Sequence, residues 1–261
     1  MSEEREAVAH EIHDGIAEVV MCRPPVNALD VASWHRLADV LRALGANRDV
    51  RVVVLRAEGK GFNAGVDIKE MQTERDKHGG HEALLGANRG CFAAFAAVYE
   101  CEVPVIAAVH GFCLGGGIGL VGNADVIVAS TDASFGLPEV DRGALGAATH
   151  LSRLVPQHKM RAMVYTSARA SAAELHAFGS VLRVVERAEL RSAALEVARE
   201  IAAKSPTVIR AAKQSLNGID LMDVKRSYRF EQGFTFELNL SGVADEAREA
   251  FTHKRPAAFS K

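Results

Sequence analysis

The most informative part of this chain is a glycine-rich stretch, Leu114-Gly-Gly-Gly-Ile-Gly-Leu120, which follows an apolar run at residues 104–109. A second stretch, Phe62-Asn-Ala-Gly-Val-Asp67, follows another apolar run at residues 50–57. Glycines placed after a strand let the backbone approach a ligand closely and turn N–H groups toward it. If the two turns converge, their amides form an oxyanion hole, a site that binds the oxygen of a reacting carbonyl.

The glycines also fit a rival pattern, because residues 117–122 match the G-x-G-x-x-G motif of dinucleotide-binding domains. The context argues against that interpretation. Gly117 lies eight residues beyond Val109, and a strand expected from Asp125 leaves room for barely two helical turns. The pattern favours a short helix that begins at the glycines and exposes its first N–H groups to a ligand.

Apolar patterns along the rest of the chain predict an α/β fold. Asp14-Gly15 joins two alternating runs and predicts a β-hairpin. Helices are expected at residues 30–44, with Asp30 or Ser33 as cap and Gly45 as end, and at 82–100, after a polar segment at 72–80. From residue 151 the pattern is mainly helical, with helices expected at 187–204, 207–217, 224–239 and 243–253. We therefore expect an α/β core over residues 1–200 and a helical C-terminal region over 201–261.

Composition excludes several classes of protein. The 261 residues are 48% hydrophobic and 25% charged, which is typical of a globular enzyme. The formal net charge of −2 gives no indication of a protein that binds nucleic acid or an anionic membrane. No apolar run has the length of a membrane span, and the acidic residues 2–6 do not resemble a signal peptide. The four cysteines lie in apolar surroundings without metal-ligand spacing. We expect reduced thiols, no metal and a cytoplasmic location.

Several motifs, in order, resemble the crotonase (enoyl-CoA hydratase/isomerase) superfamily over nearly the whole chain. They are the two glycine stretches with their strands, residues 23–29 (Arg-Pro-Pro-Val-Asn-Ala-Leu), 135–139 (Phe-Gly-Leu-Pro-Glu) and 250–255 (Ala-Phe-Thr-His-Lys-Arg). The resemblance implies a crotonase fold of repeated ββα units with a helical C-terminal trimerisation region. It also implies an acyl-CoA substrate, with coenzyme A as part of the substrate and no permanently bound cofactor. The implied assembly is a homo-oligomer, a trimer or a dimer of trimers.

The resemblance assigns roles to individual positions. The backbone N–H groups of Val66 and Gly116 are expected to bind the thioester oxygen. Lys254, beside Arg255, is expected to reach the nucleotide phosphates of coenzyme A. The alternative is that these two residues form a solvated basic tail. The remaining residues of the implied coenzyme A channel belong to the matched motifs: Arg23, Val26, Ala28, Ala64, Asp67, Ile68 and Leu114.

The number of acidic residues in the expected site limits the reactions that it can catalyse. Hydratases of this superfamily usually carry two glutamates, but here the first position is Gly119 and only the second, Glu139, is acidic. One carboxylate suffices for proton transfer in an isomerase or for activating water in a hydrolase. Apolar neighbours of Glu139 are expected to raise its pKa, which suits a general base. Asp141 forms a substitute pair with Glu139 if the segment is extended, but takes a surface position if the chain turns tightly.

Three segments, residues 111–123, 137–151 and 231–240, resemble a narrower branch of the superfamily, which opens the last five-membered ring in steroid (cholesterol) catabolism. That resemblance implies hydrolytic retro-Claisen opening of a bicyclic dioxo-indene carboxyl-CoA. Small residues at Gly119, Gly122, Ala144 and Gly146 are expected to leave room for the bicycle. The alternatives are an enoyl-CoA hydratase or double-bond isomerase acting on another bulky acyl-CoA, and a catalytically silent acyl-CoA-binding protein.

Overall fold

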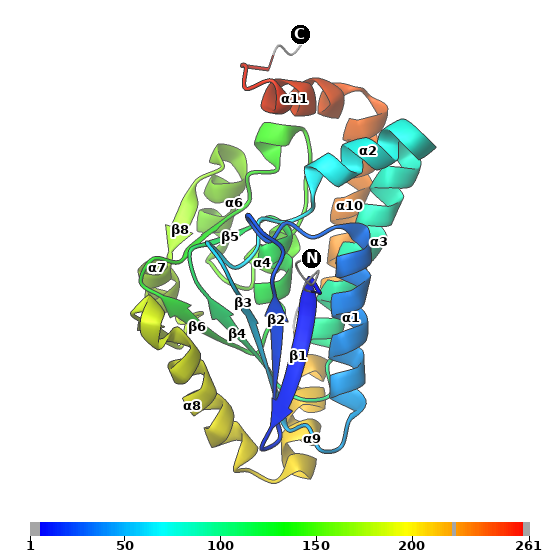
Figure 1. Cartoon of the computed structure of the whole chain (residues 1–261). Helices are drawn as coiled ribbons and strands as arrows, with labels where there is room; N and C mark the ends of the chain where they lie inside the picture. Colours follow the sequence, from blue (N-terminus) through cyan, green and yellow to red (C-terminus); the bar gives the residue numbers. More distant parts are fainter. Residues whose placement is uncertain (1–5, 221–222, 258–261) are drawn as a thin grey trace, which may run out of the picture.

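The computed structural model describes residues 6–220 and 223–257, so most of the acidic N-terminal segment lies outside the described residues (Figure 1). The chain forms one large sheet, one small sheet and a set of surrounding helices. The large sheet has the order β1-β2-β3-β4-β6-β9, parallel except for the β1–β2 hairpin. Its strands are β1 (Val8–His13), β2 (Ile16–Met21), β3 (Val52–Ala57), β4 (Val105–Val109), β6 (Val126–Ser130) and β9 (Arg183–Val185).

A small sheet of order β5-β7-β8 lies beyond the carboxyl ends of the large sheet's strands. Its strands are β5 (Phe112–Leu114), β7 (Ser134–Gly136) and β8 (Arg169–Ser171). Strands β5 and β7 follow β4 and β6 of the large sheet after short connections. Because β5 runs directly into the glycine stretch, this small sheet positions the candidate site.

Opposite faces of the large sheet bury alternate residues of each strand, as the two-residue period of a strand requires. Val52 and Val54 pack with α8 (Leu190–Ala202) in one cluster, whereas Val53 and Leu55 belong to the main core. Figure 1 shows α8 along one face of the sheet and α1 (Val31–Ala46) and α3 (Gly80–Tyr99) along the other. This layered arrangement confirms the expected α/β class.

The other helices surround the two sheets (Figure 1). They are α2 (Ile68–His78), α4 (Gly116–Val121), η1 (Val140–Arg142), α5 (Ala148–Leu151), α6 (Gln157–Thr166), α7 (Ala172–Ala177), η2 (Arg187–Glu189), α9 (Pro206–Gly218), α10 (Val224–Leu240) and α11 (Val243–Thr252). The short helix α4 begins at the glycines, as expected.

One helix was not expected, and one expected helix end was wrong. The polar segment at residues 72–80 lies mostly in α2, because the Asp67 side chain accepts hydrogen bonds from the amides of Lys69 and Glu70 and so caps this helix. Gly45 lies within α1 rather than ending it. A Cβ at Gly45 would lie 3.1 Å from the Glu102 amide nitrogen, so the glycine permits close packing there.

The C-terminal helices fold back over the site of the same chain. Helix α10 packs against α3 and α5, and α11 packs against η1. The predicted division at residue 200 falls inside α8, and the helices beyond it share in the cavity described below. Within the described residues, no helix is both long and apolar enough to cross a membrane.

Candidate active site

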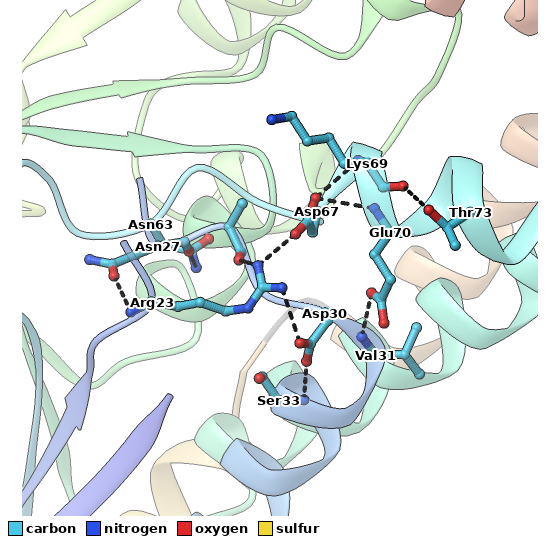
Figure 2. A network of polar contacts seen from close by, with 11 residues as sticks. Arg23, Asn27, Asp30, Val31, Ser33, Asn63, Asp67, Lys69, Glu70 and Thr73 are labelled. Carbon is cyan, nitrogen blue, oxygen red and sulfur yellow. Dashed lines mark hydrogen bonds and ion pairs between the residues drawn. The ribbon is translucent and has the colours of Figure 1, made fainter. Parts of the chain in front are cut away.

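The first glycine turn is held in place by an ionic network, shown in Figure 2. The Arg23 guanidinium donates hydrogen bonds through Nη1 to Asp67 Oδ2 and to the Ala28 carbonyl oxygen, both at 2.6 Å, and lies 3.2 Å from Asp30. Asp30 caps α1 and Asp67 caps α2. Burial alone would raise the pKa of Asp67, but the hydrogen bonds from Arg23 and from the α2 amides hold it below its ordinary value. Arg23 therefore joins the starts of two helices on either side of the turn.

Two buried asparagines connect the same turn to its neighbours. Asn27 donates from Nδ2 to the carbonyl oxygens of Glu58 and Gly61, and Asn63 donates from Nδ2 to the Asn27 carbonyl oxygen at 2.6 Å. The Asn63 side chain also accepts a hydrogen bond from the Gly65 amide. These contacts fix the backbone just before Val66.

The orientation of Val66 follows from its pairing with Leu29. The Leu29 amide donates to the Gly65 carbonyl, and the Asp67 amide donates to the Leu29 carbonyl, at 2.9 and 3.0 Å. In such a parallel bridge, the flanking residues make the hydrogen bonds and the central residue's own N–H points to the opposite side. Within the described part of the chain, the Val66 amide has no hydrogen-bond acceptor.

The second glycine turn lies directly against the first. The Leu114 amide donates to the Asn63 carbonyl at 2.8 Å, and a Cβ built on Gly65 would lie 3.1 Å from the Gly116 amide nitrogen. Gly116 is the first residue of α4, and its amide also lacks an acceptor among the described residues. The structure thus brings together the two amides that the sequence predicts for an oxyanion hole.

Glu139 lies beside the same turn. A Cβ on Gly115 would lie 2.5 Å from Glu139 Oε1, and Gly115 has a φ of +57°, so neither the space nor the backbone there suits a side chain. Glu139 Oε2 is buried and has no hydrogen-bond partner in the described structure. Burial raises the pKa of Glu139 to about 8, with Arg142 opposing and Glu231 adding to the shift. A carboxyl group with such a pKa can hold or release a proton near neutral pH.

These groups border one partly open cavity of about 140 Å³. Its wall is formed by the start of α2, by α3, by the two glycine turns and by the Glu139 segment. The C-terminal helices α10 and α11 complete it. Its lining residues are Ala64, Gly65, Val66, Ile68, Met71, Leu84, Ala87, Asn88, Cys91, Phe95, Gly115, Gly116, Glu139, Arg142, Ala144, Leu145, Gly146, Ala147, Tyr228, Thr235, Asn239 and Arg248. Two free amides and one carboxylate around a single cavity can bind a carbonyl oxygen and transfer a proton beside it.

The structure does not bring Asp141 into this cavity. The segment after Glu139 forms the tight turn η1, and Asp141 is exposed on it. The extended backbone on which a Glu139–Asp141 pair depends is therefore absent, because residues two apart in a 3₁₀ turn do not face the same side.

Phe95 excludes a second carboxylate at position 119. A Cβ on Gly119 would lie 2.2 Å from Phe95 Cζ, and one on Gly122 would lie 2.4 Å from the His150 carbonyl oxygen. The expectation that these two glycines leave room for the acyl group is therefore wrong, since both spaces are filled. Ala144 and Gly146, in contrast, do line the cavity.

Only some of the residues expected along the coenzyme A channel line the cavity. Ala64 and Ile68 line the cavity, and Val26 is 36% exposed. Arg23, Ala28 and Asp67 form the network described above, and Leu114 belongs to β5, which is hydrogen-bonded to Asn63. Lys254 is exposed just beyond α11, whereas the neighbouring Arg255 is ion-paired with Glu246. Contacts of these residues with coenzyme A stay a prediction.

Sequence reasoning missed three polar residues near the cavity: Asn88, Arg248 and Glu231. Asn88 had a recognisable signal, since it is a lone polar residue on a helical face that otherwise carries Leu84, Cys91 and Phe95. Glu231, on α10, accepts hydrogen bonds from the Ala148 and Thr149 amides, and burial raises its pKa. These contacts depend on tertiary structure and leave no local pattern.

An open apolar groove of about 880 Å³ adjoins the cavity and shares Glu139, Leu145 and Gly146 with it. Helices α6 and α10 form its sides, with Phe230 73% and Tyr165 67% exposed. Among the described residues, no three His, Cys, Asp or Glu side chains are grouped as metal ligands would be.

Comparison with known proteins gives consistent results. The family model described as "Enoyl-CoA hydratase/isomerase" matches residues 11–261. The chain is 67% identical over 240 residues to the (7aS)-7a-methyl-1,5-dioxo-2,3,5,6,7,7a-hexahydro-1H-indene-carboxyl-CoA hydrolase of Mycobacterium tuberculosis, covering 92% of this chain and 96% of the relative. It is 63% identical to the Rhodococcus jostii protein of the same name, over 91% of each chain.

Solved structures agree with this relationship. The carnitinyl-CoA hydratase of Mycobacterium avium superposes with a TM-score of 0.85 at 28% identity, over 98% of this chain and 99% of that one. The chain belongs to the enoyl-CoA hydratase/isomerase family and has the crotonase fold.

Proposed function

We propose that this protein is a coenzyme A thioester hydrolase of steroid catabolism, which opens the five-membered ring of a bicyclic dioxo-indene-carboxyl-CoA. The observation that carries the proposal is the single buried carboxylate of Glu139 beside the two free amides of Val66 and Gly116. The two relatives named as hydrolases of such a thioester, at 67% and 63% identity, support the substrate class.

The two amides favour charge on the thioester oxygen. As the reaction proceeds, that oxygen gains negative charge, and fixed N–H donors stabilise the charge without having to reorganise. The donors are held by the Arg23–Asp67 network on one side and by the start of α4 on the other. Binding at this position also places the acyl chain beside Glu139.

The proposed reaction consumes one water. Glu139, in its ionised form, removes a proton from water as the water oxygen bonds to the carbon of the ring ketone. The resulting tetrahedral oxyanion collapses, re-forms the carbonyl as a carboxylic acid, and breaks the adjacent ring carbon–carbon bond. The electron pair of that bond passes through the conjugated ring to the thioester oxygen. Protonated Glu139 then returns its proton to carbon, and the new acid ionises.

We also propose how the coenzyme A part of the substrate is bound and how the protein chains assemble. Residues 26–28 and 64–68 are proposed to contact coenzyme A, and Lys254 its phosphates, with coenzyme A present only as part of the substrate. A homotrimer or a dimer of trimers is supported by exposed apolar side chains on the C-terminal helices. These include Val208, Leu216, Ile219, Phe230 and Leu240. We also propose a cytoplasmic location, which the four unpaired cysteines support.

Glu139→Gln tests the proposal. Turnover of the bicyclic thioester should fall about 10²–10⁴-fold, the usual contribution of a general base. Its dissociation constant should change only a few-fold. If wild-type protein binds the thioester without turning it over, the protein is a silent binder. If the product has the mass of the substrate, the protein is an isomerase, and the proposal is overturned in either case.

A further inference from the structure

Helix α3 presents one face to the cavity, and Asn88 is the polar residue on that face. The other cavity-lining residues of α3 are Leu84, Ala87, Cys91 and Phe95. Their spacing of three or four residues places all five on one side of the helix. An amide group among apolar side chains at this position has no evident role in packing.

The Asn88 side chain keeps an unused hydrogen-bond donor. Its Nδ2 atom is buried and has no partner in the described structure. Two other polar residues of the cavity do have partners for their donors: Thr235 Oγ1 donates to the Leu145 carbonyl, and Asn239 Nδ2 donates to the Thr235 carbonyl. A buried donor left unpaired in a folded protein calls for an explanation, and a ligand acceptor is one.

The donor lies close to the reacting groups. Cys91, on the same face of α3, lines the cavity together with Glu139, and burial and then the charge of Glu139 raise the pKa of its thiol. Asn88 precedes Cys91 by three residues, about 4.5 Å along the helix axis at about 1.5 Å per residue. A ketone carbon attacked by water from Glu139 can therefore lie with its oxygen toward Asn88.

A positive group lies in the same wall. The Arg248 guanidinium is fixed by hydrogen bonds to Asn239 Oδ1 at 2.7 Å and to Asp245 Oδ1 at 2.6 Å, and its Nε is buried without a partner. A cavity with two unpaired side-chain N–H donors, besides the two backbone amides, is suited to an acyl group that carries oxygen atoms of its own, and not to a plain alkyl chain.

We infer that Asn88 Nδ2 donates a hydrogen bond to the ring ketone that water attacks, and so forms a second oxyanion site separate from the amides of Val66 and Gly116. As the water oxygen bonds to the ketone carbon, the carbonyl π electrons move to the ketone oxygen, where Asn88 stabilises them. When the ring carbon–carbon bond breaks, this charge returns to re-form the carbonyl. The inference rests on the proposed function, because it assigns a residue to that reaction.

The test compares two thioesters in wild-type protein and in variants of Asn88. One thioester is the bicyclic dioxo compound, and the other carries a methylene in place of the five-membered-ring ketone and cannot react. In Glu139→Gln background, where turnover is blocked, dissociation constants of both can be measured at equilibrium. We expect the ketone to bind about tenfold more tightly, as one hydrogen bond predicts. We expect Asn88→Leu to abolish this preference.

Turnover provides the second readout. Loss of an oxyanion donor typically lowers kcat about 10²–10³-fold, so Asn88→Leu should show that loss. Leu has no hydrogen-bond donor in any protonation state, so full activity in this variant overturns the inference. Arg89→Leu, on the next and exposed position of α3, is the matched control and should behave as wild type.

The outcomes separate the two proposals. If wild-type protein opens the ring and Asn88→Leu keeps both the rate and the ketone preference, the inference fails and the proposed function stands. If wild-type protein does not open the ring, the proposed function fails. The preference for the ketone thioester over the methylene thioester then still shows whether Asn88 binds the ketone. Should Asn88→Leu not fold, Asn88→Ala provides the same comparison with a smaller side chain.

Discussion

The phenyl ring of Phe95 fills the space that a side chain at Gly119 would need, since a Cβ there would lie 2.2 Å from Phe95 Cζ. The ring cannot move aside easily. It packs against Trp34, His150 and Tyr228 with centroid distances of 5.7, 5.0 and 5.3 Å. Two consequences follow: a single carboxylate serves the cavity, and position 119 is closed to larger residues.

Gly119→Ala is expected to destabilise the fold. The added methyl must displace a fully buried aromatic ring, and overpacking of this kind costs about 1–3 kcal/mol, sometimes more. Urea denaturation measures the change in the free energy of unfolding. The control is Gly233→Ala on α10, where a Cβ meets nothing within 4 Å; it should be neutral or slightly stabilising. Equal stability of the two variants would contradict the packing described.

Glu139→Gln is expected to become more stable relative to wild type as the pH rises. The folded-state pKa of about 8 lies above the ordinary value of 4.5, so between about pH 5 and 8 the native state keeps a proton that the unfolded chain loses. The wild-type free energy of unfolding therefore falls across this window and levels off above it. Gln does not titrate.

The difference in Tm between Glu139→Gln and wild type, measured at pH 5, 7 and 9, checks this sign. It should grow from pH 5 upward. The exposed Glu189→Gln on η2 serves as control for the replacement of a surface carboxyl group by an amide. A Glu139→Gln difference that is flat with pH would mean that the carboxyl group titrates as it does in water.

Asp67→Asn is expected to lower both stability and activity by loosening the first glycine turn. Asn keeps the ability to cap α2, so the variant removes chiefly the charge that pairs with Arg23. The expected cost is about 1–2 kcal/mol, since both side chains are partly exposed. Asp67→Ala should cost about 1 kcal/mol more by losing the cap.

Urea denaturation and kcat measurements on the two Asp67 variants separate the pair from the cap. Asp39→Asn, which disturbs an exposed pair with Arg42 on α1, is the control. If Asp67→Asn matches Asp39→Asn in both kcat and stability, the Arg23–Asp67 contact does not hold the turn.

Asp141→Asn is expected to change kcat less than about twofold, because surface changes away from a site are usually near neutral. Asp141 is exposed on η1 and does not line the cavity that holds Glu139. Steady-state kinetics measures the kcat of Asp141→Asn and of Glu139→Gln under the same conditions. If Asp141→Asn loses as much kcat as Glu139→Gln, Asp141 takes part in catalysis and its surface assignment is wrong.

Much of the fold could be predicted from local patterns. The Asp14-Gly15 turn, the capping Asp30 and the apolar runs of the parallel strands each have a short-range signal, and each is confirmed. The amide pair could be anticipated because two similar glycine turns follow two strands. Helix α2 was missed although Asp67 is a local cap, because its polar sequence lacks the apolar periodicity by which the other helices were recognised.

The contents of the cavity could be predicted only in part. Whether Gly119 leaves space depends on Phe95, which is 24 residues away in sequence and on another helix. The orientation of Asp141 depends on whether the chain turns after Glu139, and the local sequence left both conformations open. The contributions of Tyr228 and Arg248 require α10 and α11 to fold back onto α3 and η1, a tertiary arrangement with no local signature.

Turnover of the bicyclic dioxo-indene-carboxyl thioester in water enriched in heavy oxygen tests the proposed chemistry most directly, with the product analysed by mass spectrometry. We expect a gain of one water, with the label in a new carboxylate and the five-membered ring opened. Rapid hydration of crotonyl-CoA, with the bicyclic thioester recovered unchanged, would contradict the assignment.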